Sequence, residues 1–486
     1  MMENQGFSKA SIDDCLFYKE FKHNGEDVFI LLLMYVDDNI IISNNTECLE
    51  KFKQDMHNEF KIVDKGDIQT YLGVQIERNC TKRTLKIHQA RYLNEILSAM
   101  NIKRDDPLTY PTPLPIGVSL QKHDGVPYEH DLYRSAIGSL IYLSTWTRVD
   151  IAYAVSALAA HMANPSQDHH VALRHLLYYL HGTRTRGITY HGNDAHGINK
   201  LYGFVDADYA GDKDERKSRS GYIMMMNSGC IAWKSKLQTV IANSTTDAEV
   251  YAATLAIKEI VYLRDALRRI GLPQALQSDP TKGTTLYEDN EATTAIARTA
   301  AHREATKHMA IARSFLRYHH ENGTVSFVDC YTSMQLADFL TKSLGPQLYT
   351  KLTAEAMGDS EQKDLTKFSR RNWKEKYEEE MQRQASARKD DSTNHKNVDD
   401  CVNSVHVIPN TAQGGVLKYG YLDLVYCNCM QVPMLDENVH VICSSIEEYI
   451  KYDQHSSYVL AQVQAEDFKA EKSMYGDIVI CNRLRV

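Results

Sequence analysis

The sequence lacks the long uncharged apolar segment of a membrane protein and the basic surplus of many nucleic-acid-binding proteins. Its strongest apolar stretch, residues 28–42, is interrupted by Asp37 and Asp38. A membrane span needs about 20 mostly apolar residues, so this stretch predicts two β-strands and no membrane partner. Acidic residues outnumber basic ones, 63 to 55, and the net charge is -8. This balance argues mildly against broad nucleic-acid binding, although local basic patches matter more than the sum.

Paired cysteines are also scarce. Ten cysteines are scattered along the 486 residues, and only Cys427 and Cys429 lie close together, without a second pair at zinc-finger spacing. The pattern excludes a disulfide framework and a zinc finger. No secretory signal peptide is recognisable. We therefore expect a reducing, intracellular compartment, with a cytoplasmic particle and the nucleus both left open.

The sequence does contain an ordinary globular composition, 43% hydrophobic and 24% charged. Its length allows roughly two to four domains. In the second quarter, helical spacing occurs at residues 132–143, 150–162 and 167–180, after a proline-containing linker at 107–125. Farther on, the patterns predict strands at 200–206, 221–226, 230–234, 284–289 and 324–328, and helices at about 246–270, 291–300, 306–320 and from 333. This order predicts an α/β fold, a mixed sheet with flanking helices.

Four acidic residues of this second block are expected to converge. Asp206 is predicted to end a strand, Glu249 to lie in the first turn of the long helix, Asp289 to end a later strand, and Asp338 to lie near the last helix. Strand ends and helix starts are where an open sheet gathers a site. Like charges about 4 Å apart cost roughly 4 kcal/mol per pair at an effective dielectric of ~20, so the cluster requires a cation, protons or a catalytic role. Four carboxylates suit two Mg²⁺ ions, with Mn²⁺ as a substitute.

Each acid has a simpler interpretation when it is taken alone. Glu249 could merely complement the helix dipole, and Asp289 could cap the helix that follows it. Asp208 competes with Asp206 for the first position. We prefer Asp206 because it ends the apolar run and precedes a small residue. The set of four, rather than any single member, predicts the metal site.

The tetrapeptide Tyr-Val-Asp-Asp at residues 35–38 lies between two apolar runs and predicts a tight hairpin with Asp37 and Asp38 at its tip. Paired aspartates at such a tip can hold the two magnesium ions of a nucleotidyl transferase, whereas an isolated Asp-Asp is more often a plain turn. In this context the sequence resembles the reverse transcriptase of copia-type LTR retrotransposons, whose palm hairpin these residues match. The resemblance continues at residues 60–66, 71–76, 89–92 and 109–113.

The chain is also similar to later parts of the same family. The matching segments are 133–138, 147–151, 179–183 and, in the part that is similar to the family's RNase H domain, 205–212, 216–222, 231–236, 244–249, 289–290, 306–308 and 337–342. The resemblance implies that Asp206, Glu249, Asp289 and Asp338 are catalytic and bind the metal. It implies a truncated palm at 1–110, a thumb and connection at 111–199 and an RNase H-like domain at 200–350. A charged linker at 351–403 and an unassigned small α+β module at 404–486 would follow.

Several basic residues are weaker candidates. Phosphate contacts and a solvated turn are about equally good interpretations of five of them: Arg216, Lys217, Arg219, Lys234 and Lys236. His308 could assist product release or proton transfer, although Ala305 stands where the family has arginine. Three further histidines have no acid or cysteine at ligand spacing, so we expect packing or solvated roles for His169, His170 and His175.

The function predicted is that of an RNase H-type endoribonuclease, which hydrolyses RNA in RNA–DNA hybrids with magnesium. Other retroelement proteins are further partners that the resemblance implies. In this family a further catalytic aspartate precedes the palm hairpin, and it is missing here. We therefore expect Asp37 and Asp38 to be a remnant polymerase site without activity. Two alternatives stay open: an inert relic, whose apolar hairpin strands have no partners, and a protein that binds hybrids without cutting them.

Overall fold

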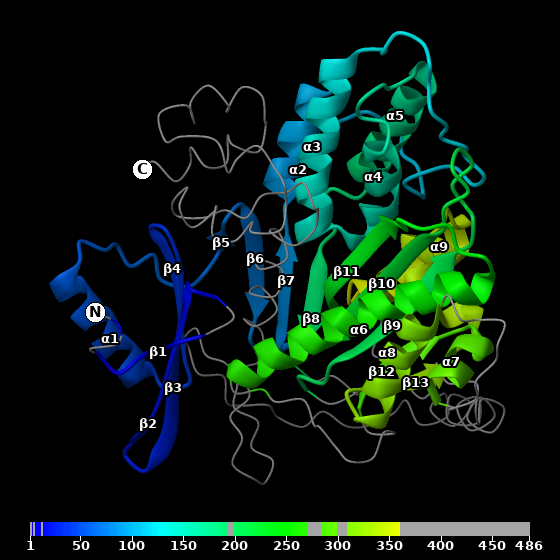
Figure 1. The fold of residues 1–486 in the computed structure, drawn as a ribbon. Helices are drawn as coiled ribbons and strands as arrows, with labels where there is room; N and C mark the ends of the chain where they lie inside the picture. Colours follow the sequence, from blue (N-terminus) through cyan, green and yellow to red (C-terminus); the bar gives the residue numbers. More distant parts are fainter. Residues whose placement is uncertain are drawn as a thin grey trace, which may run out of the picture.

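A computed structural model describes residues 2, 5–10, 13–192, 198–270, 272, 283–298 and 309–359. The described strands form three sheets, which Figure 1 shows together with the helices. The charged linker predicted at 351–403 lies outside the described residues from residue 360 onward. The module predicted at 404–486 lies wholly outside them.

The first sheet contains the predicted hairpin. Its antiparallel order is β1 (Ser8–Lys9), β2 (Leu16–His23), β3 (Glu26–Tyr35) and β4 (Asp38–Ser43). Tyr35 pairs with Asp38, and Val36 adopts a left-handed φ of 55°, so the chain reverses over Val36 and Asp37. The hairpin with its acidic tip is therefore confirmed.

Strand β3 is apolar from Val28 to Leu33, because both of its faces are buried there. Ile30 and Leu32 share a small core with helix α1 (Thr46–Glu59), whereas Phe29 and Leu31 belong to the main core on the opposite face. A strand buried on both faces has a continuous hydrophobic sequence. The hairpin strands thus find partners within this chain, which removes the reason given for the inert-relic alternative.

The second sheet joins distant segments. It contains β5 (Thr70–Tyr71), β6 (Val74–Asn79), β7 (Thr84–His88) and β8 (Ile188–His191). Between β7 and β8 lie α2 (Ala90–Ala99), α3 (His130–Trp146), the 3₁₀ turn η2 (Val149–Ile151), α4 (Ala152–Ala159) and α5 (Gln167–Gly182). The three helices predicted at 132–180 are confirmed, although the second begins as a 3₁₀ turn. Because β8 pairs with β7, the parts predicted as palm and connection share this sheet.

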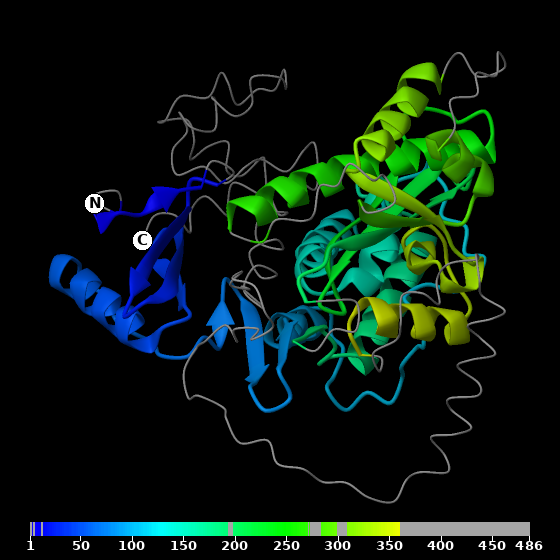
Figure 2. The same cartoon turned by 90° about the horizontal axis from the view of Figure 1, so that it is seen from below.

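The third sheet has the order β11 (Gly229–Leu237), β10 (Arg219–Met226), β9 (Tyr202–Asp208), β12 (Thr284–Glu288) and β13 (Val325–Asp329). Strands β9, β10 and β11 are antiparallel, and β12 and β13 run parallel to β9. Helices α7 (Glu291–Arg298) and α8 (Ala310–Glu321) belong to the same block. Figure 2 shows α6 (Thr245–Arg269) on one side of the sheet and α9 (Pro346–Ala356) on the other. The mixed sheet with flanking helices is therefore confirmed.

One predicted element is wrong. Instead of one helix from about residue 333, the chain forms two 3₁₀ turns, η5 (Thr332–Met334) and η6 (Leu336–Leu340), and α9 begins only at Pro346. Gln335 separates the two turns with an extended backbone. Its buried side chain donates to the Val205 carbonyl of β9 at 2.9 Å and accepts from the Ala337 amide. That anchoring fixes η6 against the sheet.

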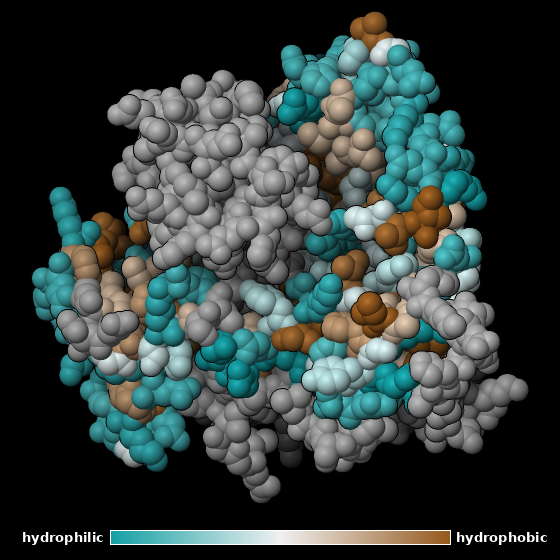
Figure 3. Space-filling model, viewed as in Figure 1, coloured by the Kyte–Doolittle hydropathy of each residue, from teal (hydrophilic) through white to brown (hydrophobic). Residues whose placement is uncertain are grey.

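Among the residues that are coloured by hydropathy in Figure 3, the apolar ones form small separate groups on the face shown. Beneath it, the main core is continuous through the chain, with members as far apart as Leu31, Ile76, Leu140 and Val205. Among the described helices, none combines the length and the hydropathy that a membrane crossing requires.

Candidate metal centre

Asp206 lies in β9, the central strand of the third sheet, and is 3% exposed. The strand continues to Asp208, so Asp206 does not end it as predicted. The Thr341 hydroxyl donates a short hydrogen bond to Asp206 Oδ2, and this oxygen also lies 3.5 Å from Lys342 Nζ. A buried carboxylate is thus held by the segment that follows η6.

Glu249 comes from α6. Ser244 caps that helix by accepting the Asp247 amide at 3.1 Å, and Thr245 is the first helical residue. Glu249 is therefore in the second turn and not in the first, where the sequence placed it. The helix dipole acts mainly on the first turn. A simple dipole role does not account for a glutamate in the second turn that is only 6% exposed.

Asp289 follows β12. Tyr287 pairs with Phe204 in parallel register, and continuing that register by two residues brings Asp289 level with Asp206. Thr332 donates to Asp289 Oδ2 at 2.8 Å. One carboxylate oxygen each of Asp206, Glu249 and Asp289 lies within 4.8 Å of the others. Three of the four predicted ligands thus converge, and we call them the carboxylate triad.

Asp338 reaches the site through η6. Gly221 of β10 pairs with Asp206, and a side chain at Gly221 would put Cβ 2.7 Å from Thr341 Cγ2 and 2.9 Å from Leu340 Cβ. Only glycine leaves room for η6 at this distance. Asp338 is 1% exposed, and its Oδ1 lies 2.9 Å from Lys342 Nζ. Among the described residues, no other group donates to this oxygen.

The electrostatics of the site favour a bound cation. Burial raises the pKa of Glu249 well above its ordinary value, and the charges of Glu288 and Asp206 raise it further. Burial and then the charge of Asp206 raise the pKa of Asp338 to about 7. The buried Glu249 Oε2 has no hydrogen-bond partner. Buried polar atoms are normally paired, and an orphaned carboxylate oxygen beside other acids fits a position where a cation binds.

Glu288 is a member of the acidic cluster that sequence reasoning missed. It ends β12 and is fully buried. Its Oε1 accepts the Asn290 amide at 3.0 Å, while Oε2 has no hydrogen-bond partner. Burial raises the pKa of Glu288 well above its ordinary value, the Asn290 amide offsets part of this, and Asp289 adds to the rise. The sequence offered no local signal for Glu288 beyond its position directly before Asp289.

Asp208, the rival for the first position, does not belong to the carboxylate triad. A side chain at Gly211 would place Cβ 1.9 Å from Asp208 Oδ2, so the carboxylate fills the space beside that glycine. Asp208 therefore packs against the turn after β9. Burial raises the pKa of Asp208, and Lys342 partly opposes this rise.

Arg219, expected either to contact phosphate or to lie in a solvated turn, makes its polar contacts within the protein. Its guanidinium donates to Ser156 at 2.7 Å and to Ser235 at 3.3 Å, and lies 5.3 Å from the centre of the Tyr153 ring. Arg219 is only 9% exposed. It joins α4 to the third sheet, so its charge is used within the protein.

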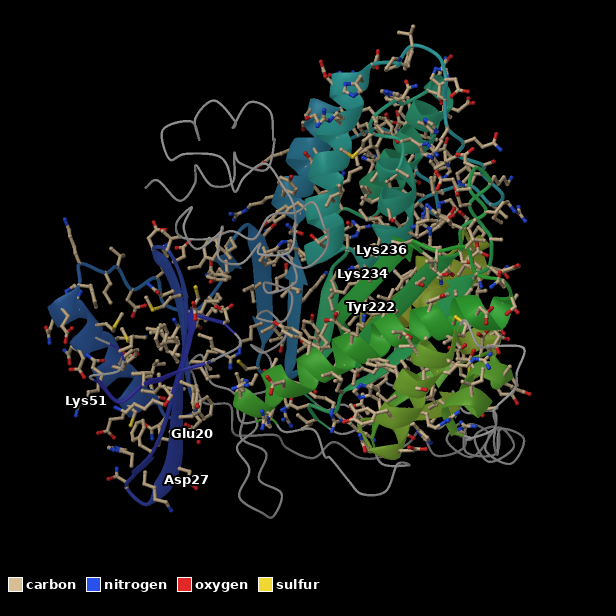
Figure 4. All side chains as sticks on the ribbon, viewed as in Figure 1. Glu20, Asp27, Lys51, Tyr222, Lys234 and Lys236 are labelled. Carbon is tan, nitrogen blue, oxygen red and sulfur yellow. The ribbon has the colours of Figure 1, made fainter. Side chains whose placement is uncertain are left out.

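The other basic candidates stay near the surface. Lys217 Nζ lies 2.6 Å from Glu215 Oε2, and Arg216 is exposed with a φ of 57°. Figure 4 shows Lys234 and Lys236 beside each other on β11, close to Tyr222 of the neighbouring strand. His308 lies outside the described residues.

The three histidines of α5 have packing roles, which confirms that expectation. His169 Nδ1 accepts the Ser166 amide at 2.9 Å. His170 and His175 bond to the backbone carbonyls of Tyr128 and Thr112 at 2.9 and 3.0 Å.

The palm hairpin differs from the third sheet in its acidic groups. Asp37 and Asp38 are exposed at its tip, and Asp38 Oδ1 lies 3.3 Å from Lys65 Nζ. In the part of the chain that the structure describes, no third metal-ligating side chain joins them at metal-binding distance. The carboxylate triad is thus the better-developed acidic site.

Parts of this chain are similar to known proteins. Residues 1–114 match the family model of reverse transcriptase (RNA-dependent DNA polymerase). The chain is 34% identical over 364 residues to the retrovirus-related Pol polyprotein from transposon TNT 1-94 of Nicotiana tabacum, covering 74% of this chain and 26% of that protein. It is 32% identical to the corresponding polyprotein from transposon RE1 of Arabidopsis thaliana, covering 70% of this chain and 22% of the relative.

A solved structure of LC11-RNase H1, isolated from compost, covers 32% of this chain and 99% of its own, at 15% identity and a TM-score of 0.23. The curated relatives are much longer than this chain, which spans about a quarter of their length. Similarity to them nevertheless covers most of this chain. The chain belongs to the retrovirus-related Pol polyproteins of copia-type retrotransposons.

Proposed function

We propose that this chain hydrolyses the RNA strand of RNA–DNA hybrids, with magnesium held by Asp206, Glu249, Asp289 and Asp338. The observation that carries the proposal is the carboxylate triad, in which one oxygen from each residue lies within 4.8 Å of the others. The buried Oε2 of Glu249 has no hydrogen-bond partner. Mg²⁺ takes hard oxygen ligands and keeps several waters. An all-carboxylate donor set therefore fits this ion.

The residues of the chain hold the ligands in place. Thr341 fixes Asp206, and Thr332 fixes Asp289. Helix α6 supplies Glu249 from its second turn. Ligands that are already in position need little rearrangement when the substrate binds. Such positioning lowers the activation free energy of the reaction. When bound, magnesium would activate the attacking water and stabilise the leaving oxygen.

Basic residues near the sheet would supply the phosphate contacts. Lys234 and Lys236 on β11, together with Arg216 and Lys217 before β10, are the candidates that the sequence named. Contacts to phosphates position a nucleic acid without reading its sequence. Selection of the RNA strand would come from its 2′-hydroxyls and from the shape of the hybrid.

The decisive assay compares three purified proteins on an end-labelled hybrid with Mg²⁺: wild type, Asp206→Asn and Asp55→Asn. Asp55 is exposed on α1, far along the chain from the site, and Asp55→Asn makes the same chemical change as Asp206→Asn. We expect RNA cleavage by wild type and the control, and none by Asp206→Asn. Hybrid binding without cleavage by wild type would favour the non-catalytic alternative. Absence of both binding and cleavage would favour the relic.

For the palm hairpin we propose that this chain performs no template-directed synthesis. The proposal is supported by the two exposed aspartates, one of which faces Lys65. An in-line displacement with two ions needs more ligands than this pair offers. Magnesium-dependent extension of a labelled primer by the purified chain would contradict it. Other segments of the longer polyproteins are the protein partners that we propose.

A further inference from the structure

Lys342 lies between two carboxylates of the metal centre. Its Nζ is 2.9 Å from Asp338 Oδ1 and 3.5 Å from Asp206 Oδ2. The lysine follows Asp338 by four residues and comes directly after Thr341, which holds Asp206. An ammonium group therefore occupies the space where these two acids approach each other.

The three side chains differ in their access to solvent. The Lys342 side chain is 36% exposed, while those of Asp206 and Asp338 are 4% and 2% exposed. The 2.9 Å contact between Lys342 Nζ and Asp338 Oδ1 is an ion pair, and no other group of the described residues donates to this oxygen. A long, partly exposed side chain with such a contact can withdraw without leaving a buried charge of its own.

The contact also divides the metal centre into two halves. Asp206, Glu249 and Asp289 converge directly as the carboxylate triad, whereas Asp338 is joined to Asp206 through the ammonium. Lys342 thus places one positive charge between Asp338 and Asp206, the triad member that both halves share. The triad is open to a cation, and the Asp338 half already contains one.

We propose that Lys342 is the internal cation of the Asp206–Asp338 half. A first divalent ion then binds to the carboxylate triad, and a second binds beside Asp338 only by displacing the ammonium. This rests on the metal site of the proposed function, but it concerns ion binding and is independent of strand cleavage. It predicts two unequal affinities in a site whose four acids alone would suggest two similar ones.

The test uses Mn²⁺ as the probe, with free ion counted from its EPR signal, on the full chain. For wild type we expect one ion to bind tightly and a second about tenfold or more weakly. In Lys342→Met the second affinity should rise by about tenfold, because one positive charge a few ångströms away has been removed. Lys51→Met, which changes an exposed lysine on α1, controls for net charge and should match wild type.

Two further measurements keep the outcome decisive. Without metal, Lys342→Met should melt at a lower temperature than wild type, and Mn²⁺ should raise its melting temperature more than it raises that of wild type. Asp338→Asn should bind a single Mn²⁺ with the affinity of the first wild-type ion. This second variant decides the matter even if Lys342→Met fails to fold.

Identical Mn²⁺ isotherms for wild type and Lys342→Met would overturn the proposal, as would two ions bound by Asp338→Asn. A loss of stability in Lys342→Met that is equal with and without Mn²⁺ would also overturn it, since it would show a purely structural lysine. Hybrid cleavage is read separately. Cleavage with unchanged isotherms rejects only the role of Lys342, and the expected isotherms without cleavage reject only the proposed hydrolysis.

Discussion

Gly221→Ala should damage the metal centre without touching a ligand. The new methyl group would lie 2.7 Å from Thr341 Cγ2, 2.9 Å from Leu340 Cβ and 3.3 Å from the Ala337 carbonyl oxygen. Carbon atoms pack at about 3.5–4.0 Å, so η6 must move by roughly 1 Å. Such overpacking typically costs about 1–3 kcal/mol of folding stability.

The displaced segment carries two functional groups. Asp338 lies within η6, and Thr341, which follows it, donates to Asp206. A misplacement of about 1 Å in a catalytic array can reduce the rate by about 10²-fold. We therefore expect the variant to lose most of its hybrid cleavage while it still folds.

The assay pairs single-turnover hybrid cleavage with urea unfolding. Gly138→Ala is the matched control, because a Cβ at this exposed position in α3 meets nothing within 4 Å. Alanine in a helix should stabilise the control by about 0.5–1 kcal/mol. Cleavage by Gly221→Ala at the wild-type rate, with wild-type stability, would show that the close approach of η6 does not position the site.

Two other predictions concern the helical block. Arg148 is 1% exposed and donates to both oxygens of Asp150 at 2.9 and 2.8 Å. Arg148→Met should leave the buried Asp150 with Arg186, 3.6 Å away, as its remaining ion-pair partner, and should cost about 3 kcal/mol in urea unfolding, unlike Arg174→Met at the surface. Burial and then His161 lower the pKa of His169 from 6.5 to about 4. Because the folded state holds this histidine neutral, its contribution is complete above pH 6.5 and is lost as the pH falls toward 4. Between pH 7 and pH 5, the free energy of unfolding of wild type should therefore fall by about 1–2 kcal/mol more than that of His169→Gln. Glutamine keeps an acceptor for the Ser166 amide, so the cap is preserved in the variant. Equal falls in stability, measured by thermal melts at the two pH values, would refute this reasoning.

The sequence could predict those site residues whose local signals match their structural positions. A strand predicted to end at Asp206, a capped helix with Glu249 and a strand predicted to end at Asp289 are all local patterns. Their convergence follows from the parallel register of β9 and β12. Glu288 had no comparable signal, because its complete burial depends on the neighbouring elements rather than on its own strand.

Two departures from the sequence-based expectations share a physical cause. In each, the residue has a hydrogen-bond partner far away in the sequence. Arg219 resembled a phosphate ligand because Ser156, 63 residues earlier, cannot be recognised as its partner from the sequence. The helix predicted from residue 333 is broken by Gln335, whose side chain donates to a carbonyl 130 residues away. Local periodicity carries no information about either contact.

The same long-range contacts show that the block at 200–350 is not structurally separate from the helices before it. Trp233 of β11 donates to the Ser144 carbonyl of α3 at 2.9 Å, and Tyr349 of α9 donates to the Asp150 carbonyl at 2.7 Å. A fragment that begins at residue 200 would leave these buried donors, and the guanidinium of Arg219, without their partners. Each unpaired buried group costs about 1–3 kcal/mol. Helix α9 is the next element after η6 in the chain, so loosening α9 would also loosen Asp338 in η6. Activity of the metal centre should therefore depend on the helical block, although no residue of that block belongs to the carboxylate triad.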